Sequence, residues 1–271
     1  MRYLREMTLG RVLIIAGSDS GGGAGIQADI KTVTALGGYA ATAITAITVQ
    51  NTLGVTGVHG VPPAVVEAQA RAVLEDIGAD ALKTGMLGDV EMVERVAAIL
   101  DTVRVPVVVD PVMVAKGGSN LLAPSAIDAV RSLMVPRATV LTPNAPEAQA
   151  LTGLSVHTTD DLRRAGERLL ALGAQAVLMK GGHVEGATVV DVLMTPSGET
   201  TFEGERLDTR HTHGTGCTLA SAVAAGLAQG MALPDAVARA WAYVHEAMRQ
   251  APGFGAGHGP LDHAWPLRGK A

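Results

Sequence analysis

The sequence alternates short apolar, β-branched segments with longer segments of helical period along most of its length. Strands are predicted at 12–16, 41–49, 80–84, 105–109, 138–142 and 176–180. Helices with apolar residues three and four positions apart are predicted between them. The segment 105–109 is apolar at both alternating sets of positions, which is typical of a central parallel strand covered on both faces. Repeated strand–helix units predict an α/β fold, either an open doubly wound sheet or an eight-stranded barrel.

The segment 189–207 distinguishes these two folds. Val189 to Thr195 and Thr200 to Leu207 are predicted to be consecutive strands joined by a turn that contains Pro196. A hairpin breaks the strict alternation of strand and helix, so it favours an open, mostly parallel sheet with an antiparallel addition. Two further helices are predicted at 217–229 and 235–250. Because no linker, low-complexity run or internal repeat interrupts the sequence, we expect one domain over residues 1–271.

The composition excludes several classes of partner. The chain has 26 acidic and 21 basic residues, a net charge of −5 and only 3% aromatic residues. Nucleic-acid binding without sequence preference needs basic charge and stacking side chains, so no nucleic-acid partner is expected. No apolar run approaches the roughly 18 residues of a membrane span, and the run 12–16 is too short for a secretory core. The only cysteine, Cys217, excludes an internal disulfide, and we expect a cytoplasmic protein.

Ligands of open α/β sheets bind beyond the carboxyl ends of the strands, so the loops after the predicted strands are where a site is expected. Six of these loops are rich in glycine or in polar residues, and a seventh opens a helix of small residues. They are 17–25, 50–52, 83–86, 110–113, 142–147, 180–183 and 211–218.

The segment 211–218 carries the strongest indication of chemistry. Its glycines let the backbone approach a ligand, and free N–H groups at a helix start carry partial positive charge, so Gly214 to Thr218 is predicted to bind an anion. Cys217 lies in the first turn of this helix, where the dipole stabilises a thiolate. It is a candidate base, nucleophile or hydrogen-bond donor. The alternative is a small buried thiol that only packs.

Two carboxylates and one amine favour phosphoryl transfer. Asp110 and Glu147 follow neighbouring strands, so we expect them to face one crevice, where carboxylates can hold Mg²⁺. Lys180, at the end of a third strand, would neutralise phosphate charge. The alternative is structural, with an aspartate in a turn and a glutamate in the first turn of a helix. His211 and His213 lack an obvious third zinc ligand and are more typical of loop histidines that bond to the backbone.

The first glycine loop matches a dinucleotide-binding fingerprint only in part. Gly23 to Ala28 fits the pattern G-x-G-x-x-A, but the acid expected about 20 residues later is missing, since 30–66 contains no Asp or Glu. A P-loop is excluded because the only Gly-Lys pair is Gly269-Lys270. No nicotinamide or flavin cofactor is therefore expected.

Amide and apolar side chains supply the other half of the predicted site. Gln50 can pair with both a donor and an acceptor on a heterocycle, and Met86, Val112 and Met113 can form adaptable apolar walls. This combination suits a small planar ring with polar edges. Either methionine can equally fill the core, and Asp29 is either an acid that complements a helix dipole or a substrate contact.

Taken together, these segments resemble the hydroxymethylpyrimidine/phosphomethylpyrimidine kinases of thiamine biosynthesis. Each motif alone is modest evidence, whereas eight motifs in the same order are specific. They run from about residue 11 to residue 263 and comprise 16–31, 50–52, 85–86, 110–113, 142–147, 180–183, 212–218 and 257–261.

The resemblance implies a three-layer α/β/α ribokinase-like sandwich, with a mostly parallel central sheet, that forms a homodimer. Such an enzyme uses ATP and Mg²⁺ to phosphorylate 4-amino-5-hydroxymethyl-2-methylpyrimidine and then to phosphorylate the monophosphate again. By motif position, the implied pyrimidine-binding residues are Gln50, Gly17, Ala24, Asp29, Met86 and Val112; the ATP-binding residues are Asn144, Lys180, His213 and Gly214; the metal ligands are Asp110 and Glu147; and the catalytic residues are Cys217, Lys180, Gly214 and Gly216.

Two other functions compete with this interpretation. Pyridoxal kinases of the same superfamily also carry the cysteine, although Gln50 and Met86 favour the aminopyrimidine. A non-catalytic pyrimidine-binding sensor on the same fold would be expected to lose Cys217, Lys180 or Glu147, and all three are present.

Overall fold

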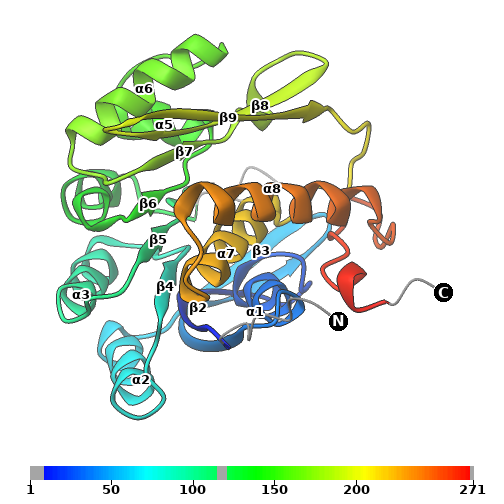
Figure 1. Ribbon diagram of the computed structural model, residues 1–271. Helices are drawn as coiled ribbons and strands as arrows, with labels where there is room; N and C mark the ends of the chain where they lie inside the picture. The colour runs from blue at the N-terminus through cyan, green and yellow to red at the C-terminus, as the bar shows by residue number, and fades with distance from the viewer. Residues whose placement is uncertain (1–8, 115–120, 269–271) are drawn as a thin grey trace, which may run out of the picture.

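The computed structural model describes residues 9–114 and 121–268, in which one mixed sheet is covered by helices on both faces (Figure 1). The strands are β1 (Arg11–Asp19), β2 (Tyr39–Asn51), β3 (Gly54–Gly60), β4 (Ala81–Thr84), β5 (Val107–Val109), β6 (Val140–Leu141), β7 (Val177–Met179), β8 (Thr188–Thr195) and β9 (Gly198–Glu205). They lie in the order β3-β2-β1-β4-β5-β6-β7-β8-β9. All pairs from β2 to β7 are parallel, and β3, β8 and β9 are added antiparallel at the two ends.

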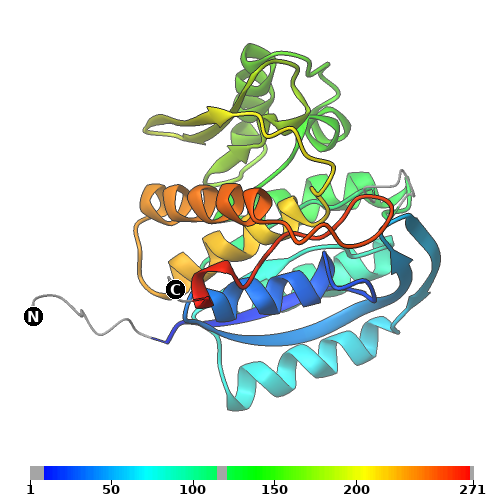
Figure 2. The same cartoon turned by 90° about the vertical axis from the view of Figure 1, so that its right-hand side faces the viewer.

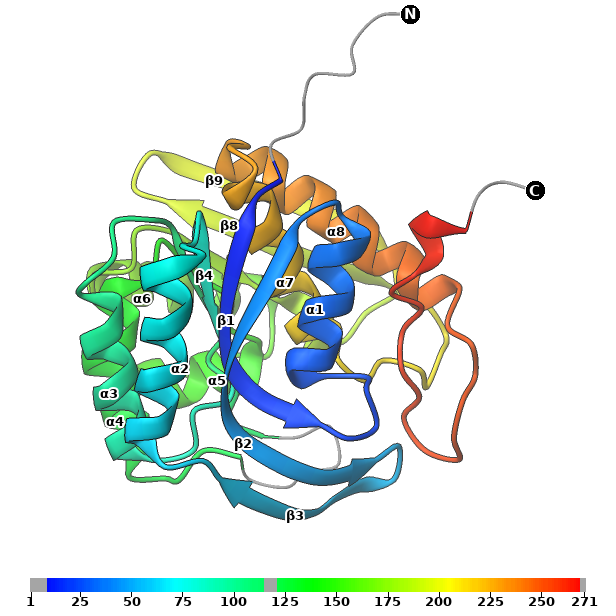
Figure 3. The same cartoon turned by 90° about the horizontal axis from the view of Figure 1, so that it is seen from below.

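Helices fill the two outer layers. They are α1 (Gly25–Ala35), α2 (Pro63–Asp76), α3 (Val90–Leu100), α4 (Ala126–Ala129), α5 (Ala145–Thr152), α6 (Thr159–Ala171), α7 (Thr215–Ala228) and α8 (Leu233–Arg249). Viewed from below, α1, α7 and α8 lie on one side of the sheet and α2, α3 and α6 on the other (Figure 3). No helix within the two described ranges is long and apolar enough to cross a membrane.

The strand β1 shows why two cores form. Leu13 and Ile15 pack into the core under α2 and α3, while Val12, Ile14 and Ala16 pack into the core under α1 and α7. Alternate side chains of a strand point to opposite faces, so a strand that is apolar at every position needs a covering layer on each side. The run that predicted a central strand is thus also the reason for the three layers.

The C-terminal segment closes one end of the molecule. After α8 it runs back past the start of α7 and ends beside α1 (Figure 2). His213 forms an isolated bridge with Pro260, Leu261 is buried in the core under α7, and the Tyr243 hydroxyl donates to the carbonyl oxygen of His263 at 2.7 Å. The segment therefore holds the loop before α7 in place.

The α/β fold with an open, mostly parallel sheet is confirmed, and the predicted hairpin is β8–β9. The barrel is excluded because β3 and β9 are free edges of the sheet. The strand β3 was not predicted, since Gly54, Gly57 and Gly60 interrupt its alternation; it is formed by antiparallel pairing with β2. Because of this pairing, β2 continues to Asn51, so Gln50 belongs to a strand and not to a loop. The single domain remains a prediction.

Two adjacent glycines after β7 offer a test of the packing. A Cβ atom on Gly181 would overlap the backbone carbonyl oxygen of Val190, whereas a Cβ atom on Gly182 would meet open space. Gly181→Ala is therefore expected to lower the free energy of unfolding by about 1–3 kcal/mol, the usual cost of overpacking. The matched variant Gly182→Ala is expected to unfold within about 0.5 kcal/mol of the original chain, as surface substitutions do. Urea denaturation measures both values, and equal stabilities would contradict the packing of this segment against β8.

Candidate active site

Two adjoining cavities open at the carboxyl ends of the parallel strands. The larger, of about 590 Å³, lies between the first glycine loop, the ends of β2, β4 and β5, and the start of α7. The smaller, of about 260 Å³, lies between the β8–β9 hairpin and helices α7 and α8. Asn144, Lys180 and Gly216 line both cavities. A molecule in one cavity would therefore meet a molecule in the other beside these residues.

The Lys180 ammonium group brings the two predicted carboxylates together. Its Nζ lies 3.0 Å from Asp110 Oδ1 and 3.8 Å from Glu147 Oε2. Asp110 directly follows β5, Glu147 is in the first turn of α5 after β6, and Lys180 directly follows β7. Three neighbouring parallel strands thus deliver the three side chains to one point. The prediction that they face one crevice is confirmed.

Burial and neighbouring charges shift the pKa values of Glu147 and Lys180. Burial raises the pKa of Glu147 to about 7, with Asp110 adding to the rise and Lys180 opposing it. Burial alone would lower the pKa of Lys180, but the two carboxylates outweigh it and raise that pKa, so the amine is protonated. When Glu147 is ionised, two carboxylates stand beside one ammonium group, and a further cation would neutralise the excess negative charge.

Local hydrogen bonds orient Asn144 and Glu147. The N–H of Glu147 donates to Asn144 Oδ1 at 2.9 Å, and the N–H of Asn144 donates to Glu147 Oε2 at 2.8 Å. This reciprocal capping box begins α5 and fixes both side chains at the junction of the cavities. Glu147 is therefore both a structural residue in the first turn of a helix and a side chain that faces the crevice.

The start of α7 is shaped by two glycines. Gly214 adopts φ of +86°, and a Cβ atom there would overlap the carbonyl oxygen of Gly23 in the first loop. A Cβ atom on Gly216 would lie 3.1 Å from Lys180 Nζ, so glycine lets the backbone approach the ammonium group. The helix begins with no side-chain cap and no acidic residue in its first turn. These features suit the predicted anion site.

The Cys217 thiol differs from its expected state. It lies partly exposed in the larger cavity, but burial of the sulfur raises the pKa of the thiol to about 12, which Lys83 opposes only in part. The helix start predicts a stabilised thiolate, whereas burial acts in the opposite direction and favours the neutral thiol in the free protein. In this state Cys217 is a neutral thiol, which can donate a hydrogen bond and accept a proton only when another group withdraws its own.

The substrate-side residues lie together, with one exception. Gly17, Ala24, Gln50, Met86 and Val112 line the larger cavity as expected. A Cβ atom on Gly17 would lie 3.2 Å from the sulfur of Met86, so the small residue leaves room for that side chain. Their roles in binding remain predictions.

Asp29 is the exception, because its side chain does not reach the cavity. It is completely buried, with Oδ1 and Oδ2 at 3.0 and 2.9 Å from Lys83 Nζ, and it accepts a hydrogen bond from Ser221 Oγ at 2.7 Å. A buried lysine needs such a counter-charge. Asp29 therefore balances Lys83, which does line the cavity, and the expected substrate contact is corrected.

His213 lies beside Asp19 and Gln50. Its Nε2 is 2.8 Å from Asp19 Oδ2 and 3.2 Å from Gln50 Nε2, and its implied role in ATP binding remains a prediction. It lines the larger cavity and not the smaller one. Gly214 likewise lines only the larger cavity. Asn144 and Lys180 line both cavities, and their roles in ATP binding remain predictions.

The wall of the smaller cavity was missed by the sequence analysis. Asp191 accepts a hydrogen bond from the N–H of Gly181 at 2.7 Å, and burial raises its pKa to about 6. Arg206 donates to three carbonyl oxygens of the loop after Lys180, and the rings of Trp241 and His245 stack with centroids 5.4 Å apart. The only sequence feature that could have indicated this wall is Asp191, a single acid inside the otherwise apolar run 189–193.

Comparison with known proteins shows the family of this chain. A family profile described as phosphomethylpyrimidine kinase matches residues 19–262. The chain belongs to the phosphomethylpyrimidine kinase family. The matched range contains every residue around the smaller cavity and all of those around the larger one except Ala16, Gly17 and Ser18.

Individual relatives cover nearly the whole chain. The hydroxymethylpyrimidine/phosphomethylpyrimidine kinase of Streptomyces coelicolor is 52% identical over 256 residues, which are 94% of this chain and 95% of that protein. The thiamine biosynthesis bifunctional protein ThiED of Geobacter sulfurreducens is 51% identical over 255 residues, and the chain spans 52% of its length. The structure of the Staphylococcus aureus pyridoxal kinase in complex with AMP-PCP and pyridoxal is similar, with a TM-score of 0.89 and 35% identity over 97% of this chain and 96% of that chain.

Cys217 is the only cysteine of the chain, so its state can be measured directly. Because the thiolate is the reactive form, a thiol pKa of about 12 predicts slow alkylation. At pH 7.5, iodoacetamide is expected to label the folded protein at least about 100-fold more slowly than glutathione, given an ordinary thiol pKa of about 8.5. The urea-unfolded chain is the control and should react at the ordinary rate. Labelling of the folded protein as fast as glutathione would contradict the neutral thiol.

Proposed function

We propose that this member of the family transfers the γ-phosphoryl group of ATP to the hydroxymethyl oxygen of 4-amino-5-hydroxymethyl-2-methylpyrimidine, and then phosphorylates the resulting monophosphate to the pyrophosphate. The pyrimidine occupies the larger cavity and the nucleotide occupies the smaller one. Two proteins named hydroxymethylpyrimidine/phosphomethylpyrimidine kinase, from Streptomyces coelicolor and Mycobacterium tuberculosis, are 52% and 49% identical over 94% and 96% of this chain and support the assignment.

One observation carries the proposal from geometry. The Lys180 ammonium group and the uncapped, glycine-lined start of α7 stand together at the junction of the two cavities. Phosphoryl transfer requires positive charge and N–H donors around the group in transit, with the acceptor on one side and the nucleotide on the other. The junction offers both features in one place.

The residues have separate tasks in the transfer. The new bond joins the hydroxymethyl oxygen to the γ-phosphorus, and the bond from that phosphorus to the β–γ bridging oxygen breaks, so ADP leaves with the electron pair. Lys180 and the backbone from Gly214 to Cys217 stabilise charge on the phosphoryl oxygens. Cys217 orients the hydroxyl group and relays its proton late. As the oxygen–phosphorus bond forms, the thiol accepts the hydroxyl proton and gives its own proton to a phosphoryl oxygen, so Cys217 is neutral before and after the step.

The donor set beside Lys180 fits a magnesium ion. Mg²⁺ usually takes one or two carboxylates and completes its shell with phosphate oxygens and water. Asp110 and Glu147 supply such a pair, and within residues 9–114 and 121–268 no group of three or more His, Cys, Asp or Glu side chains forms a cage by itself. When bound, the ion would neutralise phosphate charge. AMP-PCP in the Staphylococcus aureus structure supports ATP as the donor.

Pyridoxal is the second candidate substrate. The similar Staphylococcus aureus structure contains pyridoxal, and its fold covers almost the whole of this chain. The higher identity to the pyrimidine kinases and the amide of Gln50 in the larger cavity favour the aminopyrimidine.

A homodimer and a cytoplasmic location complete the proposal. Ile47, Val49 and Leu53, along β2 and the turn after it, are exposed by 52%, 63% and 71%, and covering such apolar side chains favours association. The single thiol agrees with a reducing compartment.

Incubation with ATP and Mg²⁺ tests the proposed function. Mass spectrometry is expected to show hydroxymethylpyrimidine gaining first one and then two phosphates, with ADP released in step. Pyridoxal is the parallel substrate and is expected to react with a lower kcat/KM. Phosphorylation of pyridoxal alone would mean that the protein is a pyridoxal kinase. Binding of the pyrimidine without turnover would contradict the proposed kinase activity.

A further inference from the structure

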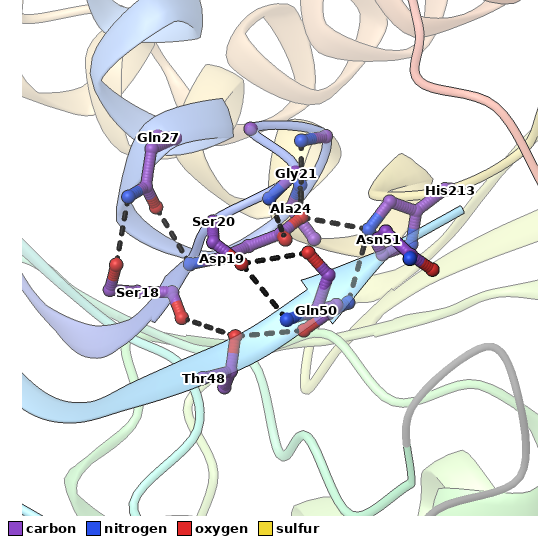
Figure 4. Close-up of polar contacts among 12 residues, drawn as sticks. Ser18, Asp19, Ser20, Gly21, Ala24, Gln27, Thr48, Gln50, Asn51 and His213 are labelled. Atoms are coloured by element: carbon purple, nitrogen blue, oxygen red, sulfur yellow. Dashed lines mark hydrogen bonds and ion pairs between the residues drawn. The ribbon is translucent and has the colours of Figure 1, made fainter. Parts of the chain in front are cut away.

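The Asp19 carboxylate is the hub of a hydrogen-bond network that the proposed chemistry does not use. It stands at the end of β1 with only 2% of its surface exposed. The N–H groups of Gly21, Gly23 and Ala24 donate to it at 2.8, 3.1 and 2.8 Å, so the first glycine loop is folded around it (Figure 4). Its fourth partner is His213 Nε2, at 2.8 Å, from the loop before α7. One carboxylate therefore ties together the two glycine-rich loops.

This pairing determines the tautomer of His213. Burial alone would raise the pKa of Asp19, but hydrogen bonds from His213 and from the loop outweigh it and lower that pKa, so Asp19 is ionised. An ionised carboxylate only accepts hydrogen bonds. His213 Nε2 must therefore carry the hydrogen that points at Asp19, and it cannot act as an acceptor.

The same nitrogen also faces the amide of Gln50. An amide nitrogen toward His213, at 3.2 Å, would place two donors against each other. At the other end of the amide, the oxygen would lie 3.1 Å from Thr48 Oγ1, whose single hydrogen is already donated to the carbonyl oxygen of Ser18 at 2.8 Å. Both mismatches vanish when the amide is turned over, since the two ends have nearly the same shape. Gln50 Oε1 then shares the single Nε2 hydrogen of His213 with Asp19 in a three-centre hydrogen bond, and Gln50 Nε2 donates to Thr48.

We propose that Asp19 and His213 are positioning residues that fix this orientation of the Gln50 amide and thereby select an aminopyrimidine in the larger cavity. With its two flanks occupied, the amide presents one lone pair and one N–H side by side at its tip. That pair matches a ring nitrogen next to an amino group, which donates and accepts at adjacent atoms. Pyridoxal has no amino group beside its ring nitrogen. The inference rests on the proposed function and adds the residues that decide between its two candidate substrates.

Two amide variants of His213 separate this role from simple packing. A glutamine side chain places an NH₂ group about where imidazole Nε2 lies, and asparagine ends one methylene short. His213→Gln is expected to keep KM for hydroxymethylpyrimidine within about threefold, because its two hydrogens serve Asp19 and Gln50. His213→Asn is expected to raise that KM about tenfold or more, the usual effect of leaving buried polar groups unpaired. In both variants the KM for pyridoxal is expected to change less than threefold, and for hydroxymethylpyrimidine KM is expected to change more than kcat. Equal effects of the two variants, or a loss confined to kcat, would overturn the proposal.

A double-mutant cycle shows whether His213 acts through Gln50. In the Gln50→Ala background, His213→Gln and His213→Asn are expected to have the same KM within about twofold, since the amide to be oriented is absent. A tenfold difference that persists in that background would mean that His213 contacts the substrate or only shapes the loop. It would overturn the proposal that His213 acts by orienting the Gln50 amide. Thermal unfolding of each variant confirms that folded proteins are compared.

Substitutions at Thr48 test the other flank of the Gln50 amide. Thr48→Ser keeps the acceptor and is expected to keep KM for the pyrimidine within about threefold, whereas Thr48→Val is expected to raise it about tenfold. Calorimetric binding of hydroxymethylpyrimidine is measured for every variant as well. A parent protein that binds the pyrimidine without forming product would overturn the proposed function. The binding constants of the variants would still show whether Asp19 and His213 orient the Gln50 amide. Absence of pyrimidine binding would overturn both.

Discussion

The contact between the Lys180 ammonium group and the carboxylates of Asp110 and Glu147 is the constraint around which the rest of the molecule is arranged. It joins the ends of three neighbouring strands, at 3.0 and 3.8 Å, in a place where an unpaired charge would be costly. Glycine at position 216 follows from it, because a side chain there would press on the ammonium group. The two cavities meet at this contact, so the same charges that complete the fold stand where phosphate would pass.

Helix α7 connects the two halves of the site. Its first turn borders both cavities, its Ser221 reaches the buried Asp29–Lys83 pair, and the loop before it carries His213 to the substrate side. The first glycine loop packs against that loop so closely that Gly214 has no room for a side chain. In the proposed function, one short segment would therefore couple the orientation of the pyrimidine to the stabilisation of the phosphate, although different residues perform the two tasks.

Much of this arrangement could be predicted from the sequence, because it follows from the geometry of parallel strands. The carboxyl ends of such strands meet at one edge, which placed Asp110, Glu147 and Lys180 together, and glycines before a small-residue helix indicated the phosphate cradle. Pairings between distant segments were not visible. Asp29 and Lys83 are 54 residues apart, and Asp19 and His213 are 194 residues apart, so no local pattern shows that they meet. The thiol pKa of Cys217 depends on burial, which outweighed the helix start. The strand β3 depends on its partner β2, because its own sequence favours a loop.

The most direct test of the account is the variant Lys180→Met, which keeps a side chain of similar length and removes its charge. If Lys180 stabilises the phosphoryl group in transit, kcat for hydroxymethylpyrimidine falls by about a thousandfold. The dissociation constant of the pyrimidine, measured by calorimetry, should stay within about threefold, because the substrate is held by the other end of the larger cavity. A Lys180→Met variant that turns over at the original rate, or that loses pyrimidine affinity as strongly as rate, would contradict the account.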